Sequence, residues 1–311
     1  MTIKLINSSS AHFGAVRLVA FDSSNEKLIS IGEEEGRLYV WNTDTLSPST
    51  GTTIEKKTED YLVRAAAFPN DFSFLFGGNN NELTHADWPD CKEYTVFVKS
   101  TNEIDFISSK WDTNTIAYSD QHTIRFFDKE NTTYPELNIE SSITWLDFSK
   151  NAKYFAVSCS DSSVNIWNAN DFSEIFRKKF DLGSSHPSWG PGDFLLIPVS
   201  LSPGTVIIIN VEERKEHQVQ NPIEDESTTT QLALSNNYML AIADDSKKIA
   251  FFQLNQDYSL THFSTTQYSG SELSTLSFGS LNTNLIAAGD TEGTLFLFEL
   301  SDNKKSQLNS V

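Results

Sequence analysis

One short sequence pattern recurs seven times along the chain, and this repetition constrains the fold more than any other feature. Each copy is a small or polar turn, then alternating apolar residues, then an aromatic or aliphatic end. The copies are residues 36–41, 81–86, 122–127, 162–167, 204–209, 247–252 and 293–298, so their ends are 40 to 46 residues apart. A period of this length is typical of repeat folds in which each repeat is one four-stranded blade.

The residues around each copy have the composition of further strands. Two β-branched or aromatic runs precede the first copy, at 16–21 and 27–31, and two precede the fourth, at 143–148 and 154–158. A weaker, more polar run follows, such as 94–98. The sequence therefore predicts an all-β fold, a single seven-bladed β-propeller of four-stranded antiparallel blades over residues 1–300. Residues 301–311 are predicted to be a polar tail that is disordered or begins a linker.

The seventh repeat has no good fourth strand, because the residues after Leu300 are polar and patternless. The run Ile3-Lys-Leu-Ile6 precedes the first repeat and has strand character. We expect it to supply the outer strand of the last blade, so that the two chain ends close the ring and leave no blade incomplete.

Composition excludes several broad classes of protein. The chain of 311 residues is 12% aromatic, which is inconsistent with a disordered chain, and its net charge of −19 disfavours sequence-independent binding to DNA or RNA. Cys91 and Cys159 cannot build a disulfide framework and lack the spacing of zinc ligands, which favours a reducing compartment. Neither a secretion signal nor an apolar run of about 20 residues is recognisable. We expect a soluble, intracellular protein with no membrane partner.

Three dipeptides resemble the Trp-Asp signature of WD-repeat propellers: Trp41-Asn42, Phe127-Asp128 and Trp167-Asn168. The best copy of the turn and strand is Ser160-Asp-Ser-Ser-Val-Asn-Ile-Trp-Asn168, although no true Trp-Asp pair and no Gly-His pair is present. The resemblance implies aromatic residues wedged between blades and turn carboxylates that accept local hydrogen bonds.

A narrower resemblance follows the order of the repeats. Residues 188–199, Ser-Trp-Gly-Pro-Gly-Asp-Phe-Leu-Leu-Ile-Pro-Val, are similar to a Trp-x-Pro-x-Gly stretch in one replisome adaptor family. His85-Ala-Asp-Trp-Pro-Asp90, His12 before Val-Ala-Phe-Asp22, and Gly289-Asp-Thr-Glu-Gly-Thr-Leu295 are similar to its second, first and last repeats. The family is that of chromosome transmission fidelity protein 4 and acidic nucleoplasmic DNA-binding protein.

This resemblance implies a nuclear, non-catalytic module that links replisome components, such as DNA polymerase alpha and the helicase, in replication, chromatin and sister chromatid cohesion. It also implies an N-terminal fragment of a longer protein, monomeric by itself. Histones and other basic segments are the expected partners, and no sequence-specific nucleic acid binding is expected. The alternative is a scaffold subunit of another assembly, such as a coat, a nuclear pore or a ubiquitin-ligase adaptor.

Catalytic and cofactor motifs are not recognisable in the sequence. The six histidines (12, 85, 122, 186, 217 and 262) lie in no nucleophile or zinc-protease signature, and phosphate-binding glycine motifs are missing. A metal in the central channel would need carboxylates or histidines at the starts of the inner strands. The expected inner strands begin at mostly apolar residues: Val16, Leu62, Ile104, Ile143, Ser188, Gln231 and Leu273. We therefore expect no enzyme activity, no metal and no cofactor.

Charge is predicted to be unequal on the two faces of the ring. Acidic residues fall mainly in the loops between blades and in the turns between the two middle strands, which emerge on one face. The candidate partner-binding residues there are Glu33, Glu34, Glu35, Glu59, Asp60, Asp120, Asp161, Asp244, Asp245, Asp290 and Glu292. We expect this face to attract a basic protein segment. Arg17, Arg64 and Arg125 are expected to form structural ion pairs.

Two further stretches, 47–53 and 221–230, are rich in Ser and Thr. They have the composition of loops outside the repeat and are candidate phosphorylation sites.

Overall fold

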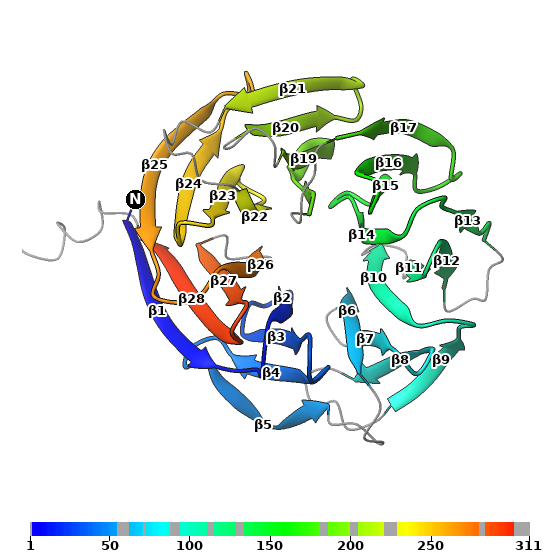
Figure 1. Cartoon of the computed structure of the whole chain (residues 1–311), viewed down its shortest axis with the longest axis horizontal. Helices are drawn as coiled ribbons and strands as arrows, with labels where there is room; N and C mark the ends of the chain where they lie inside the picture. The colour runs from blue at the N-terminus through cyan, green and yellow to red at the C-terminus, as the bar shows by residue number, and fades with distance from the viewer. Residues whose placement is uncertain are drawn as a thin grey trace, which may run out of the picture.

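Seven four-stranded antiparallel sheets are arranged as the blades of a ring in the computed structural model of the chain (Figure 1). The structure describes residues 2–54, 62–70, 73–87, 94–110, 115–128, 134–180, 186–199, 205–220, 229–279 and 284–301. Within these ranges the only helical segment is a short 3-10 turn, η1 (Pro191–Asp193). The predicted all-β, seven-bladed propeller is confirmed.

Six blades are formed by four consecutive strands, and the seventh combines the two ends of the chain. From the inner to the outer edge, the strands are β2 (Val16–Phe21), β3 (Lys27–Gly32), β4 (Leu38–Asn42) and β5 (Ser47–Ile54) in blade 1; β6 (Val63–Asn70), β7 (Ser73–Gly78), β8 (Glu82–Asp87) and β9 (Tyr94–Lys99) in blade 2; β10 (Ile104–Lys110), β11 (Thr115–Asp120), β12 (Thr123–Phe127) and β13 (Leu137–Asn138) in blade 3; β14 (Ile143–Phe148), β15 (Tyr154–Cys159), β16 (Ser163–Asn168) and β17 (Glu174–Lys179) in blade 4; β18 (Ser188–Trp189), β19 (Phe194–Val199), β20 (Thr205–Asn210) and β21 (Lys215–Gln220) in blade 5; β22 (Thr229–Leu234), β23 (Met239–Asp244), β24 (Lys248–Leu254) and β25 (Leu260–Gln267) in blade 6; and β26 (Leu273–Phe278), β27 (Leu285–Asp290), β28 (Thr294–Ser301) and β1 (Thr2–Ser10) in blade 7.

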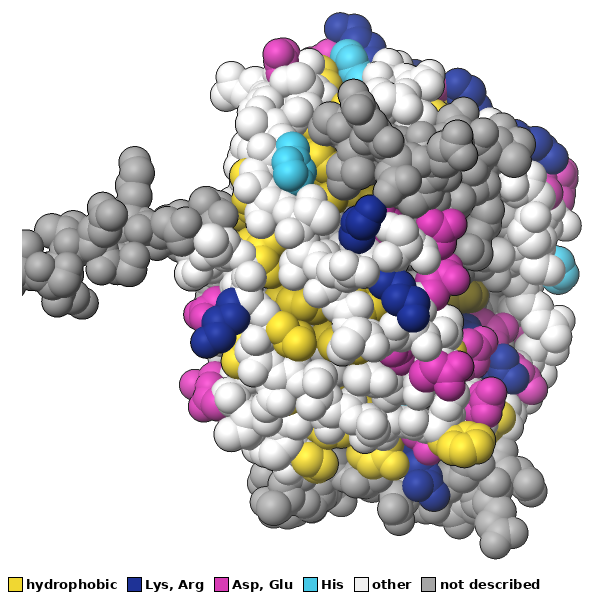
Figure 2. All heavy atoms as spheres, turned by 60° about the vertical axis from the view of Figure 1, so that its left-hand side comes forward, with side chains coloured by type: hydrophobic (Ala, Val, Ile, Leu, Met, Phe, Trp, Pro, Cys, Tyr) yellow, Lys and Arg dark blue, Asp and Glu magenta, His cyan; other side chains and the backbone are white. Residues whose placement is uncertain are grey.

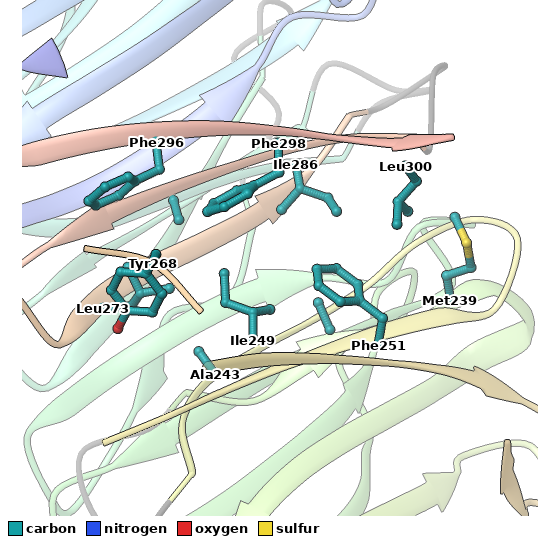
Figure 3. Packing of buried hydrophobic residues seen from close by; sticks show 12 residues of the cluster. Met239, Ala243, Ile249, Phe251, Tyr268, Leu273, Ile286, Phe296, Phe298 and Leu300 are labelled. Atoms are coloured by element: carbon teal, nitrogen blue, oxygen red, sulfur yellow. The ribbon is translucent and has the colours of Figure 1, made fainter. Parts of the chain in front are cut away.

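The recurring sequence pattern corresponds to the third strand of every blade. Alternate side chains of these strands point to opposite neighbouring blades, because successive side chains of a strand lie on opposite faces of its sheet. In β28, Phe296 and Phe298 pack toward blade 6, whereas Leu295 and Leu297 pack toward blade 1. Figure 3 shows the first set facing Ile249 and other side chains of blade 6 across the interface. The core is therefore distributed among the blade interfaces.

The ring is closed by β1, which pairs antiparallel with β28. Ile3 lies opposite Leu300 and Ser10 lies opposite Thr294, with a bulge between Leu5 and Asn7. The Asn7 amide also donates to the backbone oxygen of Thr45 in blade 1, at 2.6 Å. The expected closing strand is confirmed, and it is longer than the run 3–6 on which it was predicted.

Two strands are unusual: one was not expected from the sequence, and the other is much shorter than the inner strands of the other blades. Residues 47–53, expected to be a loop from their Ser, Thr and Gly content, lie in the outer strand β5. The inner strand β18 has only two residues, and the chain then turns through Gly190 and η1. A Cβ atom on Gly190 would lie 2.1 Å from Leu234 Cδ2, so a larger residue there would displace the Leu234 side chain.

Candidate partner-binding face

The turns between the second and third strands and the loops between blades lie at the same end of the ring. This end is called the loop face below. Among the acidic residues predicted there, Glu33, Glu34, Asp245 and Glu292 have exposed side chains. Glu59 and Asp60 lie outside the described residues, as do residues 221–228. Figure 2 shows Asp and Glu side chains gathered over one part of the surface beside blade 7, with scattered Lys and Arg among them.

Asp120, Asp244 and Asp290 end the second strands of their blades and are buried, at 1%, 7% and 1% exposure. Asp290 accepts hydrogen bonds from the backbone N–H groups of Thr294 at 2.7 Å and Ser271 at 2.9 Å. Asp244 accepts one from Lys248 N–H at 3.0 Å. These carboxylates stabilise turns, as expected from the WD-repeat resemblance, and they do not contribute to the exposed acidic surface.

Asp120 is held by side-chain hydroxyl groups and an arginine, whereas Asp244 and Asp290 accept from backbone N–H groups. Its carboxylate accepts from the hydroxyl groups of Ser100 at 2.8 Å and Thr101 at 2.9 Å, and it pairs with Arg125. Burial raises the pKa of Asp120, but these hydrogen bonds and the charge of Arg125 outweigh burial and hold the pKa below its ordinary value. Asp120 is therefore an ionised structural group.

Glu35 lies in the same turn as Glu33 and Glu34 but points inward. Its carboxylate is 2.7 Å from His12 Nδ1, and His12 Nε2 is 2.6 Å from Ser30 Oγ. The Trp41 indole N–H donates to the same Ser30 oxygen at 2.8 Å. These contacts form one continuous network from blade 1 to the loop that precedes it, so Glu35 is a structural residue. His12 and Trp41 are each recognisable in the sequence, but no sequence pattern connects them to Glu35.

Basic residues also lie on the loop face, and they are more than Lys247 and Lys248, the two that the sequence places there. Lys179 Nζ is 2.7 Å from Asp161, whose pKa is lowered by this contact and by hydrogen bonds from Ser163. Lys99 Nζ is 3.2 Å from Glu82. Each of these lysines ends an outer strand, where its side chain reaches the neighbouring turn. The acidic character of the loop face is therefore reduced around blades 2 and 4.

On the loop face, four exposed carboxylates lie where blades 7 and 1 meet. We define the acidic sector as Glu33, Glu34, Glu272 and Glu292, all of which are exposed. Backbone hydrogen bonds make the sector continuous, since Thr291 N–H donates to Glu272, His12 N–H to Gly293 and Glu33 N–H to Ala15. Within the sector, Glu33 forms an ion pair with Arg17, and their charged atoms are 3.8 Å apart.

Phe13 lies within the acidic sector and is 77% exposed, the highest value among the large hydrophobic residues of the described chain. Its two neighbours are tightly held: His12 is buried in the network above, and Gly14 has a positive φ of 82°. A Cβ atom on Gly14 would lie 2.6 Å from Glu34 Cδ, so the Glu34 side chain rests against the loop. The loop thus presents an aromatic ring to solvent beside carboxylates.

The central channel opens beside this sector and encloses about 750 Å³. At the mouth of the channel, Arg17 connects blades 1, 2 and 3. Its guanidinium donates to the backbone oxygens of Arg64 at 2.8 Å and Asp105 at 3.3 Å. Arg64 in turn pairs with Glu103 at 3.2 Å and Asp105 at 3.4 Å. The three arginines predicted to form structural ion pairs therefore all do so.

Asp147 lines the channel farther from the loop face. Burial raises its pKa to about 6, although a hydrogen bond from Ser108 at 2.6 Å and the nearby charge of Lys150 act in the opposite direction. The Lys150 ammonium donates to the backbone oxygen of Leu234 at 2.8 Å, across the short inner strand of blade 5. These contacts join inner strands of different blades, so Asp147 and Lys150 stabilise the channel wall.

The described residues contain no group of three or more His, Cys, Asp or Glu side chains that could hold a metal ion. Within the same part of the chain, no helix has the length and apolar character needed to cross a bilayer.

Comparison with known proteins identifies one repeat and the fold. Residues 134–168 match the model described as WD domain, G-beta repeat. No curated protein sequence matches the chain.

Two solved structures have the same architecture over nearly their whole length. One is described as the structure of U3-55K (TM-score 0.75, 11% identity, 96% of this chain and 98% of the other). The second is a chain from the crystal structure of the mitotic checkpoint complex (TM-score 0.78, 15% identity, 96% of this chain and 95% of the other). The chain thus contains a WD40 repeat within a seven-bladed β-propeller, an architecture typical of protein-interaction scaffolds without catalytic activity.

Proposed function

We propose that this propeller is a protein-interaction module whose acidic sector binds a basic segment of a partner protein. The observation that carries the proposal is Phe13, which is 77% exposed on a rigid loop between Glu34 and Glu292. An aromatic face attracts Lys and Arg side chains by about 0.5–1 kcal/mol at exposed sites, and adjacent carboxylates favour the same side chains. A preformed loop also limits the conformational entropy lost on binding.

More specifically, we propose that the chain acts as the N-terminal WD-repeat module of a nuclear replication or chromatin adaptor. Two features support it: the order of the motif resemblances along the repeats, and the net charge of −19 together with the position of the acidic sector. Histone tails and basic segments of replisome proteins are then the expected partners, with DNA polymerase alpha and the helicase among the components that the adaptor would link.

Affinity capture from nuclear extract, followed by quantitative mass spectrometry, tests this proposal. The wild-type chain is compared with Phe13→Ala and with Glu33→Lys/Glu34→Lys. A control, Glu212→Lys/Glu299→Lys, makes the same charge change at exposed positions away from the sector. Histones or replication proteins should be recovered with the wild type and the control and be depleted from both sector variants. Equal recovery with all variants would contradict a role for the sector.

A second candidate function is that of a scaffold subunit that packs stably against one partner. The observation that favours it is the pair Leu5 and Ile6, each 39% exposed on β1, the outer strand of blade 7. An exposed outer strand with apolar side chains is a common docking edge. In this case the capture experiment would return one stoichiometric partner, and Leu5→Ser/Ile6→Ser would lose it while Phe13→Ala would not.

A further inference from the structure

Within the described residues of blade 3, the outer strand β13 is short (Figure 1). A groove lies beside it, between blades 3 and 4. The outer strand β13 has two residues, whereas the outer strands of the other blades have six to nine. The groove encloses about 200 Å³. One wall is the segment from Glu136 to Glu140, and the other is formed by β16 and β17.

Asn165 lies in the lining of this groove and is only 3% exposed. Its amide nitrogen faces Cys159 Sγ at 3.8 Å, whereas its carbonyl oxygen Oδ1 is buried and has no hydrogen-bond partner in the described structure. A buried acceptor without a donor is unfavourable and rare in native proteins. A ligand that brings a hydrogen-bond donor into the groove would satisfy it.

The rim of the groove favours a positively charged donor. Glu136, Glu140 and Glu174 line it together with a single cation, Arg177. Arg177 Nη2 is 3.2 Å from Glu140, with both side chains largely exposed, while the Glu136 carboxylate accepts from Arg125 at 2.9 Å. The lining therefore carries three carboxylates and one guanidinium, and it is negative overall.

We propose that the blade 3–4 groove binds a Lys or Arg side chain from a partner protein. The cationic head would donate a hydrogen bond to Asn165 Oδ1, and the rim carboxylates would balance its charge. The volume admits one long side chain, and Trp167, also in the lining, would contact its methylene groups. This site is separate from the acidic sector, so it does not depend on the function proposed for that sector.

The probes are acetyl-Gly-Arg-Gly-amide and acetyl-Gly-Lys-Gly-amide, with acetyl-Gly-Gln-Gly-amide as the uncharged control. They are titrated into the ¹⁵N-labelled chain while the Asn165 side-chain amide and the Trp167 indole resonances are followed. The Arg or Lys peptide should shift both resonances in a saturable manner, and the Gln peptide should not. Absence of a shift, or equal shifts with the Gln peptide, would overturn the proposal.

Two variants separate binding from a structural role. Asn165→Leu should abolish the Trp167 response and leave the melting temperature unchanged or higher, because it removes an unsatisfied buried acceptor. Glu174→Gln should weaken peptide binding about threefold, whereas Glu299→Gln, with the same charge change on blade 7, should not. A lower melting temperature for Asn165→Leu together with equal affinities for Glu174→Gln and Glu299→Gln would show that Asn165 is structural and would overturn the site.

Discussion

His12 Nδ1 lies 2.7 Å from the Glu35 carboxylate, and this contact joins the loop before blade 1 to the turn within it. With a neutral imidazole the hydrogen bonds run in one direction: the Trp41 indole donates to Ser30, the Ser30 hydroxyl donates to His12 Nε2, and His12 Nδ1–H donates to Glu35. The environment of the imidazole favours this neutral form, because burial lowers the pKa of His12 more than Glu35 raises it.

The lowered pKa of His12 predicts a loss of stability in mild acid. The unfolded chain binds a proton at this residue near pH 6.5, at a higher pH than the folded chain does. The free energy of unfolding should therefore fall as the pH decreases below about 6.5, and the loss should level off below the folded pKa. Urea unfolding between pH 8 and pH 5 measures this.

The control for this prediction uses two histidine variants. His12→Gln should show a shallower pH dependence than the wild type, whereas His262→Gln, at an exposed position on β25, should keep the wild-type profile. An unchanged slope in His12→Gln would contradict the account of the network.

Asp147 predicts a pH effect of the opposite sign. Its pKa is raised from 3.8 to about 6 by burial, so the folded chain retains this proton more strongly and stability is lost as the pH rises from about 4 to 6. Asp147→Asn should therefore increase the free energy of unfolding by about 1–2 kcal/mol at pH 7.5 and by little at pH 4. Urea unfolding of the variant at both pH values checks this, and destabilisation at pH 7.5 would show that the ionised carboxylate is required.

The closing strand predicts a large effect of a short deletion. Removing residues 1–8 eliminates most of β1 and uncovers the outer side of β28, so the melting temperature should fall by at least about 5 °C. Lys4→Ala, at an exposed position on the same strand, should change it by less than about 1 °C. An unchanged melting temperature after the deletion would show that the pairing of β1 with β28 contributes nothing to stability.

The repeat was enough to predict the number of blades, the third strand of each and the closing role of the N-terminus. These features depend on local alternation and turn residues, which each repeat contains in full. The strand β5 was missed because Ser, Thr and Gly favour loops by composition, whereas its pairing with β4 is a tertiary contact. The two-residue length of the outer strand β13 was not predicted from the sequence either.

The candidate site was only partly predictable for a related reason. Loop topology predicted which end of the ring carries these acidic residues, but it did not distinguish exposed side chains from those used internally. Glu33, Glu34 and Glu35 are consecutive, but only the Glu35 side chain points inward, because the His12 imidazole lies within hydrogen-bond distance of it. Phe13 carried no sequence signal, since an aromatic residue in a propeller is expected to be buried.

Calorimetric titration of histone H3 tail peptide into the chain, at about 50 and 150 mM salt, tests the central claim most directly. The account predicts binding that weakens with salt, and at least a tenfold loss of affinity in Glu33→Lys/Glu34→Lys. The control Glu212→Lys/Glu299→Lys, which changes the net charge equally, should stay within about threefold of the wild type. No binding at either salt concentration, or equal losses in the two variants, would contradict the claim that the acidic sector binds a basic partner.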